Sequence, residues 1–273
     1  TTGYSNSALG TSALSTNTTG YSNSAMGQDA LLYNTTGYQN TAIGMSAIKN
    51  NTTGYSNSAL GVNALTTNTT GYSNTAMGLD VLHENTTGYQ NTVLGQSVLY
   101  YNTTGFRNSV LGSGALYNNT SATSSVAVGA GSGRGPASYN AGEITAVGTE
   151  SLYSIATGAE DNTALGYRAG YGVTTGANNI LIGYQAGYSS TNLTTGSNNI
   201  IIGYDIGATS TTMTRGLNVG NLIFGTGLDG TGTTLSSGNV GIGTTSPYAK
   251  LSIHANNGDT SSTLFTIASS TAN

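Results

Sequence analysis

A seventeen-residue repeat runs through the first part of this chain. The ring at Tyr4 returns every seventeen residues as far as Phe106, and columns of glycine, asparagine and paired apolar residues keep the same register. Self-similarity at a short fixed period is typical of solenoids, in which each repeat packs mainly against its neighbours. The repeat therefore predicts a stack of similar coils. The ring column and the first asparagine column are Tyr4, Tyr21, Tyr38, Tyr55, Tyr72, Tyr89 and Phe106, and Asn6, Asn23, Asn40, Asn57, Asn74, Asn91 and Asn108.

The residues of one repeat favour strands and turns over helices. Gly, Thr, Ser and Asn dominate the first unit, TTGYSNSALGTSALSTN. These residues weaken helices through backbone entropy, β-branching or competing side-chain hydrogen bonds. A coil of this length has room for two short strands and two turns. We therefore predict an all-β, parallel β-solenoid, in which each strand pairs in register with its copy in the next coil.

The apolar columns predict how a coil is filled. Leu9, Leu14 and their equivalents are expected to fill the interior, while Ala8 and Ala13 lie on the other face and permit close packing. Asparagine amides and aromatic rings can form ladders in such stacks, so both columns are interpreted as structural. Because one coil encloses only a few apolar side chains, neighbouring coils and other chains must complete the core. We therefore expect a homotrimer built around a symmetry axis.

The register divides the chain into three predicted parts. Residues 1–119 form the regular β-roll. Residues 120–220 continue it irregularly, since Gly-terminated apolar triplets recur there at intervals close to seventeen. Within that part, residues 130–143 are expected to protrude as a loop. Residues 221–273 are predicted to be a transition module of short antiparallel strands, with one alternating strand over 250–254 and a further apolar alternation over 264–267.

Few side chains carry charge, which excludes several functions. Charged residues make up 6% of the chain and the formal net charge is −4, against a usual charged fraction of ~25%. No basic patch is present to bind nucleic acid. No apolar run of about 18 residues is present to span a membrane. With no cysteine, neither disulfides nor thiolate chemistry is available.

The titratable residues show no catalytic or metal-binding spacing, so no catalytic residue, metal or cofactor is expected. One enzymatic alternative stays open, because a pair of carboxylates can cleave a glycosidic bond. Carboxylates clustered in a groove would favour that alternative, whereas scattered carboxylates on loops would favour a fibre. The residues concerned are Asp29, Asp80, Glu84, Glu143, Glu150, Glu160, Asp161, Asp205, Asp229 and Asp259, with His83 and His254.

A recurring Asn-Thr-Thr sequence has two interpretations. Each copy is a formal N-glycosylation sequon, and a glycan on every coil would coat the molecule. Asn and Thr are also ordinary turn-forming residues. The candidate glycosylation sites are Asn17, Asn34, Asn51, Asn68, Asn85, Asn102 and Asn119.

The segments TTGYSNSALG (1–10), TTGANNILIG (174–183) and TTGSNNIIIG (194–203) resemble the repeat of trimeric autotransporter adhesin heads. The segment SSGNVGIGTTSPYAKLSI (236–253) is similar to the part of phage tail-fibre proteins that precedes a chaperone domain. The first resemblance implies a left-handed roll with three chains to a head, and both imply trimeric extracellular fibres. The adhesin repeat usually has about fourteen residues and lacks the tyrosine column.

These features predict a non-enzymatic, extracellular structural or adhesive fibre or filament subunit, located on a cell surface or in a virion fibre. The expected partners are further copies of the chain and a cell-surface glycan or receptor. Because the first repeat has no cap, we expect that end to dock onto another copy, head to tail. The alternatives are a phage tail-fibre segment that recognises a host receptor and a polysaccharide-cleaving tail spike.

Overall fold

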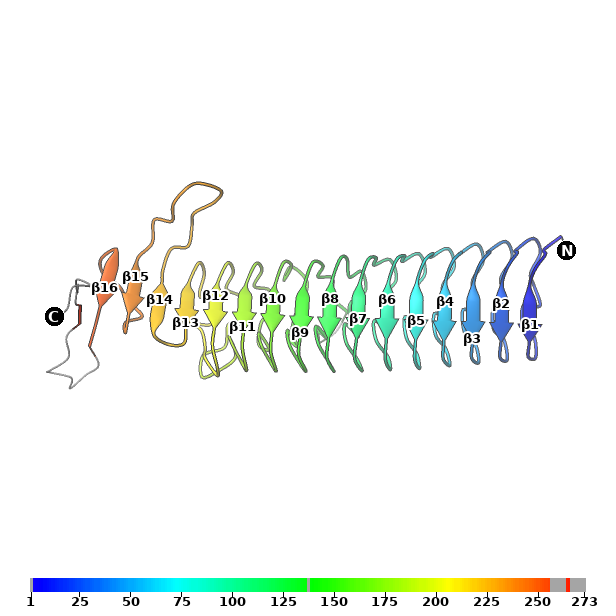
Figure 1. Cartoon of the computed structure of the whole chain (residues 1–273), viewed down its shortest axis with the longest axis horizontal. Helices are drawn as coiled ribbons and strands as arrows, with labels where there is room; N and C mark the ends of the chain where they lie inside the picture. Colours follow the sequence, from blue (N-terminus) through cyan, green and yellow to red (C-terminus); the bar gives the residue numbers. More distant parts are fainter. Residues whose placement is uncertain (1, 137, 256–263, 266–273) are drawn as a thin grey trace, which may run out of the picture.

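The chain forms a rod of stacked coils. The structure is a computed structural model that describes residues 2–136, 138–255 and 264–265. Its strands form one 16-stranded sheet and follow one another along the rod in chain order (Figure 1). The first eight strands begin seventeen residues apart, and the pairing from β1 to β13 is parallel and in register. The predicted all-β parallel solenoid is confirmed.

Each strand has three residues. The strands are β1 (Ser7–Leu9), β2 (Ser24–Met26), β3 (Thr41–Ile43), β4 (Ser58–Leu60), β5 (Thr75–Met77), β6 (Thr92–Leu94), β7 (Ser109–Leu111), β8 (Val126–Val128), β9 (Thr145–Val147), β10 (Thr163–Leu165), β11 (Ile180–Ile182), β12 (Ile200–Ile202), β13 (Leu217–Val219), β14 (Ile223–Gly225), β15 (Val240–Ile242) and β16 (Leu251–Ile253). β8 to β13 confirm that the apolar triplets after residue 119 continue the roll.

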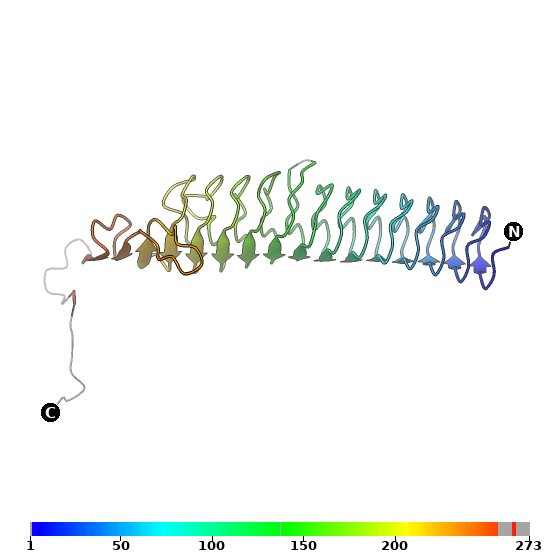
Figure 2. The same cartoon turned by 90° about the horizontal axis from the view of Figure 1, so that it is seen from above.

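Each coil of the regular part contains one strand, so the prediction of two strands was wrong. The second apolar segment is a ribbon of turns, in which Asn63 (φ 54°) and Leu65 (φ 58°) adopt left-handed backbone conformations. The Leu65 N–H donates to Val81 O in the next coil at 2.9 Å, and the Asn68 N–H donates back to Leu65 O at 3.3 Å. Inter-coil bonds and local turns thus alternate along this segment. Figure 2 shows the strands along one face of the rod and the turns opposite.

The interior is filled differently from the prediction. Side chains alternate along a strand, and the central residue of each three-residue strand points inward. Ala42 is therefore buried, while Leu9 is 66% exposed, so placing the Leu9 column inside was wrong. The Leu14 column lies inside as predicted, for example at Leu31. The Ala8 and Ala13 columns also lie inside, because the large side chain from the turn segment leaves room only for small residues facing it.

The segment that provides the large interior side chain changes along the rod. In the regular part this side chain comes from the turn segment, as at Leu65, opposite a strand alanine. In β11 it comes from the strand, at Leu181, and the turn segment then provides Gly187. A Cβ at Gly170, one coil earlier, would lie only 2.6 Å from Leu181 Cδ1. The large side chains of neighbouring coils therefore fill the space that a coil with alanine in its strand and glycine in its turn segment leaves open.

Two buried ladders of asparagine amides run through the regular part. Asn57 Nδ2 donates to Asn40 Oδ1 at 3.1 Å and to Gly71 O at 2.8 Å, and the Asn57 N–H donates to the same Asn40 Oδ1 at 3.0 Å. In the second ladder, Asn68 Nδ2 donates to Asn51 Oδ1 at 2.8 Å and to Gly71 O at 3.0 Å. Each amide is thus bonded to the copy one coil earlier, which confirms the structural interpretation of these columns.

One glycine column sets the distance between coils at the corner after each strand. Gly61 has φ 141° and a Cβ there would lie 2.1 Å from Gly78 O. Only glycine meets both conditions without strain. The column therefore allows neighbouring corners to approach at the spacing that the sheet requires.

The structure agrees with the predicted C-terminal change of strand direction but only partly with the predicted protruding loop. Within residues 130–143, Arg134 stacks on Tyr117 and Tyr139 is buried, so the described part of the insertion folds partly back onto the roll. After β13, β14 and β15 pair in an antiparallel manner, which confirms the predicted transition, and β16 then pairs parallel to β15. The apolar alternation predicted over 264–267 lies largely outside the described residues.

We expect Asn57→Ala to destabilise the rod. The substitution removes a buried donor to Gly71 O and the acceptor of two Asn74 donors. Leaving buried polar groups unpaired costs about 1–3 kcal/mol each, so the free energy of unfolding should fall by about 2–4 kcal/mol. Urea unfolding followed by circular dichroism measures this change. Ser58→Ala, on the exposed face of β4, is the control and should leave the transition unchanged; equal midpoints for both variants would contradict the role of the ladder.

Candidate functional site

The ring column forms a continuous stack along one edge of the rod. From Tyr4 to Phe106, successive rings lie 4.7–5.1 Å apart between centroids and within 3–7° of parallel. The stack ends at Phe106. The next coil places Thr123 beside it, in a parallel bridge, and the coil after that places Gly142 beside Thr123.

The asparagine ladders are interrupted in the same region, and the first one resumes at Asn162. The first ladder passes from Asn108 to Ser125, whose N–H still donates to Asn108 Oδ1 at 3.0 Å. In the second ladder, Asn119 Nδ2 donates to Ala141 O at 2.7 Å instead of to the preceding asparagine. Asn102 Oδ1 is consequently buried without a hydrogen-bond partner among the described residues. Three columns are thus interrupted within about two coils of one another.

A hollow of about 380 Å³ opens where the columns stop. Its volume falls within the range of ~300–1,000 Å³ that is usual for small-molecule sites. A Cβ at Gly142 would lie 2.3 Å from Thr123 Oγ1, so a side chain there would displace Thr123. The lining residues come from four successive coils and are Thr104, Phe106, Ser121, Thr123, Asn140, Gly142, Glu143 and Glu160.

The polar side chains of the hollow have free hydrogen-bonding capacity. In the regular part, the first threonine of each Thr pair donates to the next coil, as Thr69 Oγ1 does to Thr86 O at 3.0 Å, and Thr103 and Thr120 continue this pattern at the hollow. Thr104 and Ser121 occupy the second position of the pair, whose side chain stays free of internal hydrogen bonds in the described regular coils as well. Within the described residues, no hydrogen bond is formed by the side chains of Thr104, Ser121, Thr123 or Asn140. These groups line an open surface and are available to a ligand.

Three carboxylates gather at one end of the hollow. Glu143 and Asp161 occupy the same column in successive coils, and Glu160 lies next to Asp161 in the chain. The hydrogen bond with the Asp161 carboxyl, followed by the charges of Asp161 and Glu160, raises the pKa of Glu143. All three side chains are exposed, and they are clustered beside the hollow.

No cation neutralises this cluster in the part of the chain that the structure describes. Arg107 lies beside the ring of Phe106, at 5.8 Å from its centroid, but its Nε donates to Gln90 Oε1 of the preceding coil at 3.2 Å. Other carboxylates do have partners. Those pairs are Asp29 with Lys49, Asp80 with Asn63, Glu84 with His83, Glu150 with Arg168, and Asp229 with Ser237.

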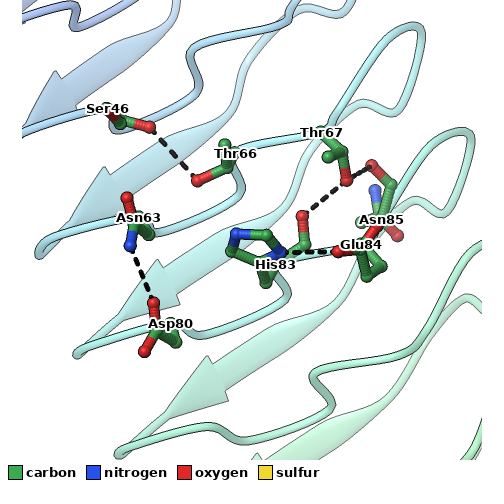
Figure 3. Close-up of polar contacts among 8 residues, drawn as sticks. All are labelled: Ser46, Asn63, Thr66, Thr67, Asp80, His83, Glu84 and Asn85. Atoms are coloured by element: carbon green, nitrogen blue, oxygen red, sulfur yellow. Dashed lines mark hydrogen bonds and ion pairs between the residues drawn. The ribbon is translucent and has the colours of Figure 1, made fainter.

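The polar groups around His83 join coils and do not form a second site (Figure 3). His83 Nδ1 lies 2.8 Å from Glu84 Oε1, and Thr67 Oγ1 donates to His83 O at 2.5 Å. Asn63 Nδ2 donates to Asp80 Oδ1 at 2.9 Å. Over the described ranges, no three histidine, aspartate or glutamate side chains are grouped so that they can hold a metal ion.

The buried sequons argue against N-glycosylation of the folded chain. Six of the candidate asparagines, namely Asn34, Asn51, Asn68, Asn85, Asn102 and Asn119, are fully buried. The Asn51 amide nitrogen donates to Asn34 Oδ1 at 2.6 Å and to Gly54 O at 2.9 Å, which uses both of its hydrogens. A glycan on that nitrogen would break the ladder. Asn17, in the first coil, is half-buried and donates to Gly20 O.

A second surface of interest is the outward face of the sheet. The third residue of each parallel strand points outward and is apolar from β1 to β13. We call this line the apolar row. From Leu9 to Leu111 its members are 38–66% exposed. No strand from β1 to β13 contains a charged residue. The row consists of Leu9, Met26, Ile43, Leu60, Met77, Leu94, Leu111, Val128, Val147, Leu165, Ile182, Ile202 and Val219.

Sequence reasoning found the columns but missed the hollow. The signal was present, because Thr123 and Gly142 stand where the ring column would continue, and Glu143, Glu160 and Asp161 follow within the next two coils. Insertions shift this region by one or two residues from the strict period. The alignment of Glu143 with Asp161 therefore becomes evident only from the strand register.

We expect Asp161→Asn to lower the pKa of Glu143. Asparagine removes the charge that disfavours ionisation of Glu143, and an amide donor stabilises the ionised carboxylate. The pKa is measured from the pH dependence of the Glu143 carboxyl carbon resonance in NMR. Asp205→Asn, at an exposed left-handed position two coils further on, is the matched control. An unchanged Glu143 pKa in Asp161→Asn would show that the two carboxyls do not interact.

Comparison with known proteins adds no family to this description. No family model matches the chain, and neither a curated protein nor a solved structure matches it. Among the described residues, no helix is long and apolar enough to cross a membrane. The chain is thus characterised by its own geometry, a parallel β-solenoid with an exposed apolar row and a polar hollow.

Proposed function

We propose that this chain is the subunit of an extracellular structural and adhesive fibre, assembled as a homotrimer of parallel rods. The apolar row is the observation that supports this proposal most. It gives a long rod a continuous apolar line on one face, with no charge in the strands that carry it. Extended apolar patches on a protein surface are typical of interaction sites.

The dimensions of the sheet face fit an interface between rods. Thirteen parallel strands at ~4.8 Å spacing give a face about 60 Å long, and three residues at ~3.3 Å give a width of about 10 Å. The resulting strip has a flat area of about 600 Å² per chain, which a trimer would divide between two neighbours; a stable two-chain interface buries ~800 Å² of accessible surface per partner, so side-chain relief and the C-terminal part of the face must contribute as well. A second row, the first residue of each strand, adds apolar area towards the C-terminal end at Val126, Ile180, Ile200 and Leu217.

The shape of the face favours association around an axis parallel to the rod. Shallow hollows of about 250, 100 and 250 Å³ lie between the two outward rows, over β1–β3, β3–β5 and β6–β8. These hollows form because the residues between the two rows, such as Ala25 and Ala59, are small and their side chains point into the rod. In the regular part the apolar row lies beside a row of serine and threonine, so a single apolar line faces the axis while the polar row stays towards solvent.

We expect Leu60→Asp combined with Met77→Asp to dissociate the assembly. Both side chains are exposed in the single chain, at 45% and 39%, so the coil itself should still fold. Two carboxylates per chain would be buried against their copies, which is strongly unfavourable. Sedimentation equilibrium should give a trimer for the unmodified chain and a monomer for the double variant.

Tyr33→Asp provides the control for this experiment. Tyr33 is 49% exposed and belongs to the turn segment opposite the sheet, so the same new charge should leave the trimer intact. A monomer for the unmodified chain, or dissociation by Tyr33→Asp to the same degree, would refute the proposed interface.

A second candidate function is cleavage of a polysaccharide. It is favoured by one observation: Glu143 and Glu160 line the same hollow, and the pKa of Glu143 is raised, as a general acid requires. The open shape of the hollow would admit a chain of sugars.

The phage tail-fibre alternative shares the rod and the proposed trimer and differs in its biological setting.

For this candidate we expect Glu143→Gln to lower the release of reducing ends from a β-1,4-linked glucosamine polymer by roughly 100-fold or more, as loss of a general acid usually does. Asp205→Asn should leave the rate unchanged. An unmodified chain that releases no reducing ends from this polymer removes the candidate.

A further inference from the structure

The break in the ring column leaves a place for one more ring. Phe106 stacks on Tyr89 at 4.7 Å and lines the hollow on the side of the following coil. The positions that would carry the next two rings are Thr123 and Gly142, neither of which is aromatic. A flat or chair-shaped ring of a ligand can therefore continue the stack over these two coils.

The groups around that place belong to three chemical kinds. An aromatic face is provided by Phe106. Hydroxyl and amide groups without internal partners are provided by Thr104, Ser121, Thr123 and Asn140. A negative charge without a counter-ion in the described residues is provided by Glu143 and Glu160, with Asp161 behind them.

From this combination we infer that the hollow binds an oligosaccharide of amino sugars, with one sugar ring lying on Phe106 and the ammonium group of a neighbouring sugar beside Glu143 and Glu160, two and three coils further along the rod. The C–H face of the sugar packs on the aromatic ring. Its hydroxyls meet the unpartnered threonine, serine and asparagine side chains. Its positive charge compensates the carboxylates.

Other ligands match fewer of these features. A neutral or N-acetylated sugar leaves the carboxylates without a counter-charge. A simple alkylammonium ion satisfies the charge but not the hydroxyl-lined wall. The inference deepens the adhesive function proposed above, on which it rests for its biological setting, because it names the surface glycan as one that carries free amino groups. Binding itself requires neither trimer formation nor cleavage.

The test is a binding measurement on the full chain by saturation-transfer NMR and calorimetry. The probes are the β-1,4-linked glucosamine tetrasaccharide, its N-acetylated counterpart and methylammonium. The unmodified chain should bind the glucosamine tetrasaccharide about tenfold or more tightly than either other probe, a ratio that corresponds to the loss of one charge-assisted contact.

Two variants locate the site. Glu143→Gln with Glu160→Gln should weaken binding of the glucosamine tetrasaccharide by roughly tenfold and remove the preference over the acetylated one. Phe106→Leu should weaken binding of both sugars by about tenfold through loss of the aromatic face. The matched controls are Asp205→Asn for the charge and Tyr38→Leu for the ring, since Tyr38 stacks far from the hollow; both should bind as the unmodified chain does.

The inference is overturned by equal affinity for the two sugars, by methylammonium binding within about threefold of the glucosamine tetrasaccharide, or by variants that bind as the unmodified chain does. Sedimentation of the same samples separates this result from assembly. A monomer that binds the glucosamine tetrasaccharide refutes the trimer and keeps the site, whereas a trimer that binds no probe refutes the site alone.

Discussion

The structure depends on one constraint: every coil must place its backbone one strand spacing from the next. At ~4.8 Å, identical side chains in neighbouring coils are close enough to touch. That distance brings Asn57 within bonding distance of both Asn40 and Asn74, and stacks Tyr55 on Tyr72 with 5.0 Å between centroids. A side chain that cannot stack on its own copy is therefore disfavoured inside the rod, which explains why charged residues are so few in its regular part.

The interior is unusual because asparagine side chains fill much of the space inside each coil. A regular coil encloses two small apolar residues and one large one, together with two asparagines whose polar groups are all bonded. Such a core buries little apolar area for hydrophobic stabilisation, so the ladders have to be complete. The orphan oxygen of Asn102 marks the place where a ladder is not complete, and the polar hollow opens beside it.

The period predicted the stack, its parallel pairing, the ladders and the change of topology near Gly220. It did not predict which face the apolar residues occupy. Residues with a Cβ disfavour left-handed backbone conformations, so nothing in the sequence indicated that Leu65 and Ile48 would adopt them. That conformation turns them inward from a ribbon of turns and moves the Leu9 column outward. The hollow was missed for a related reason, since its residues come together through a register that insertions obscure.

The exchange of interior volume between Leu65-type and Leu181-type coils has a consequence for how such a chain can change in evolution. A whole coil of the first type can be duplicated or deleted between two others of that type, because both of its neighbours present the same surface. Each event would change the reach of the rod by about 4.8 Å and leave the hollow intact. Across the boundary, where Gly170 makes room for Leu181, the same event would place two large side chains in one space. Length can thus vary freely only on the side of the rod that carries the ring column.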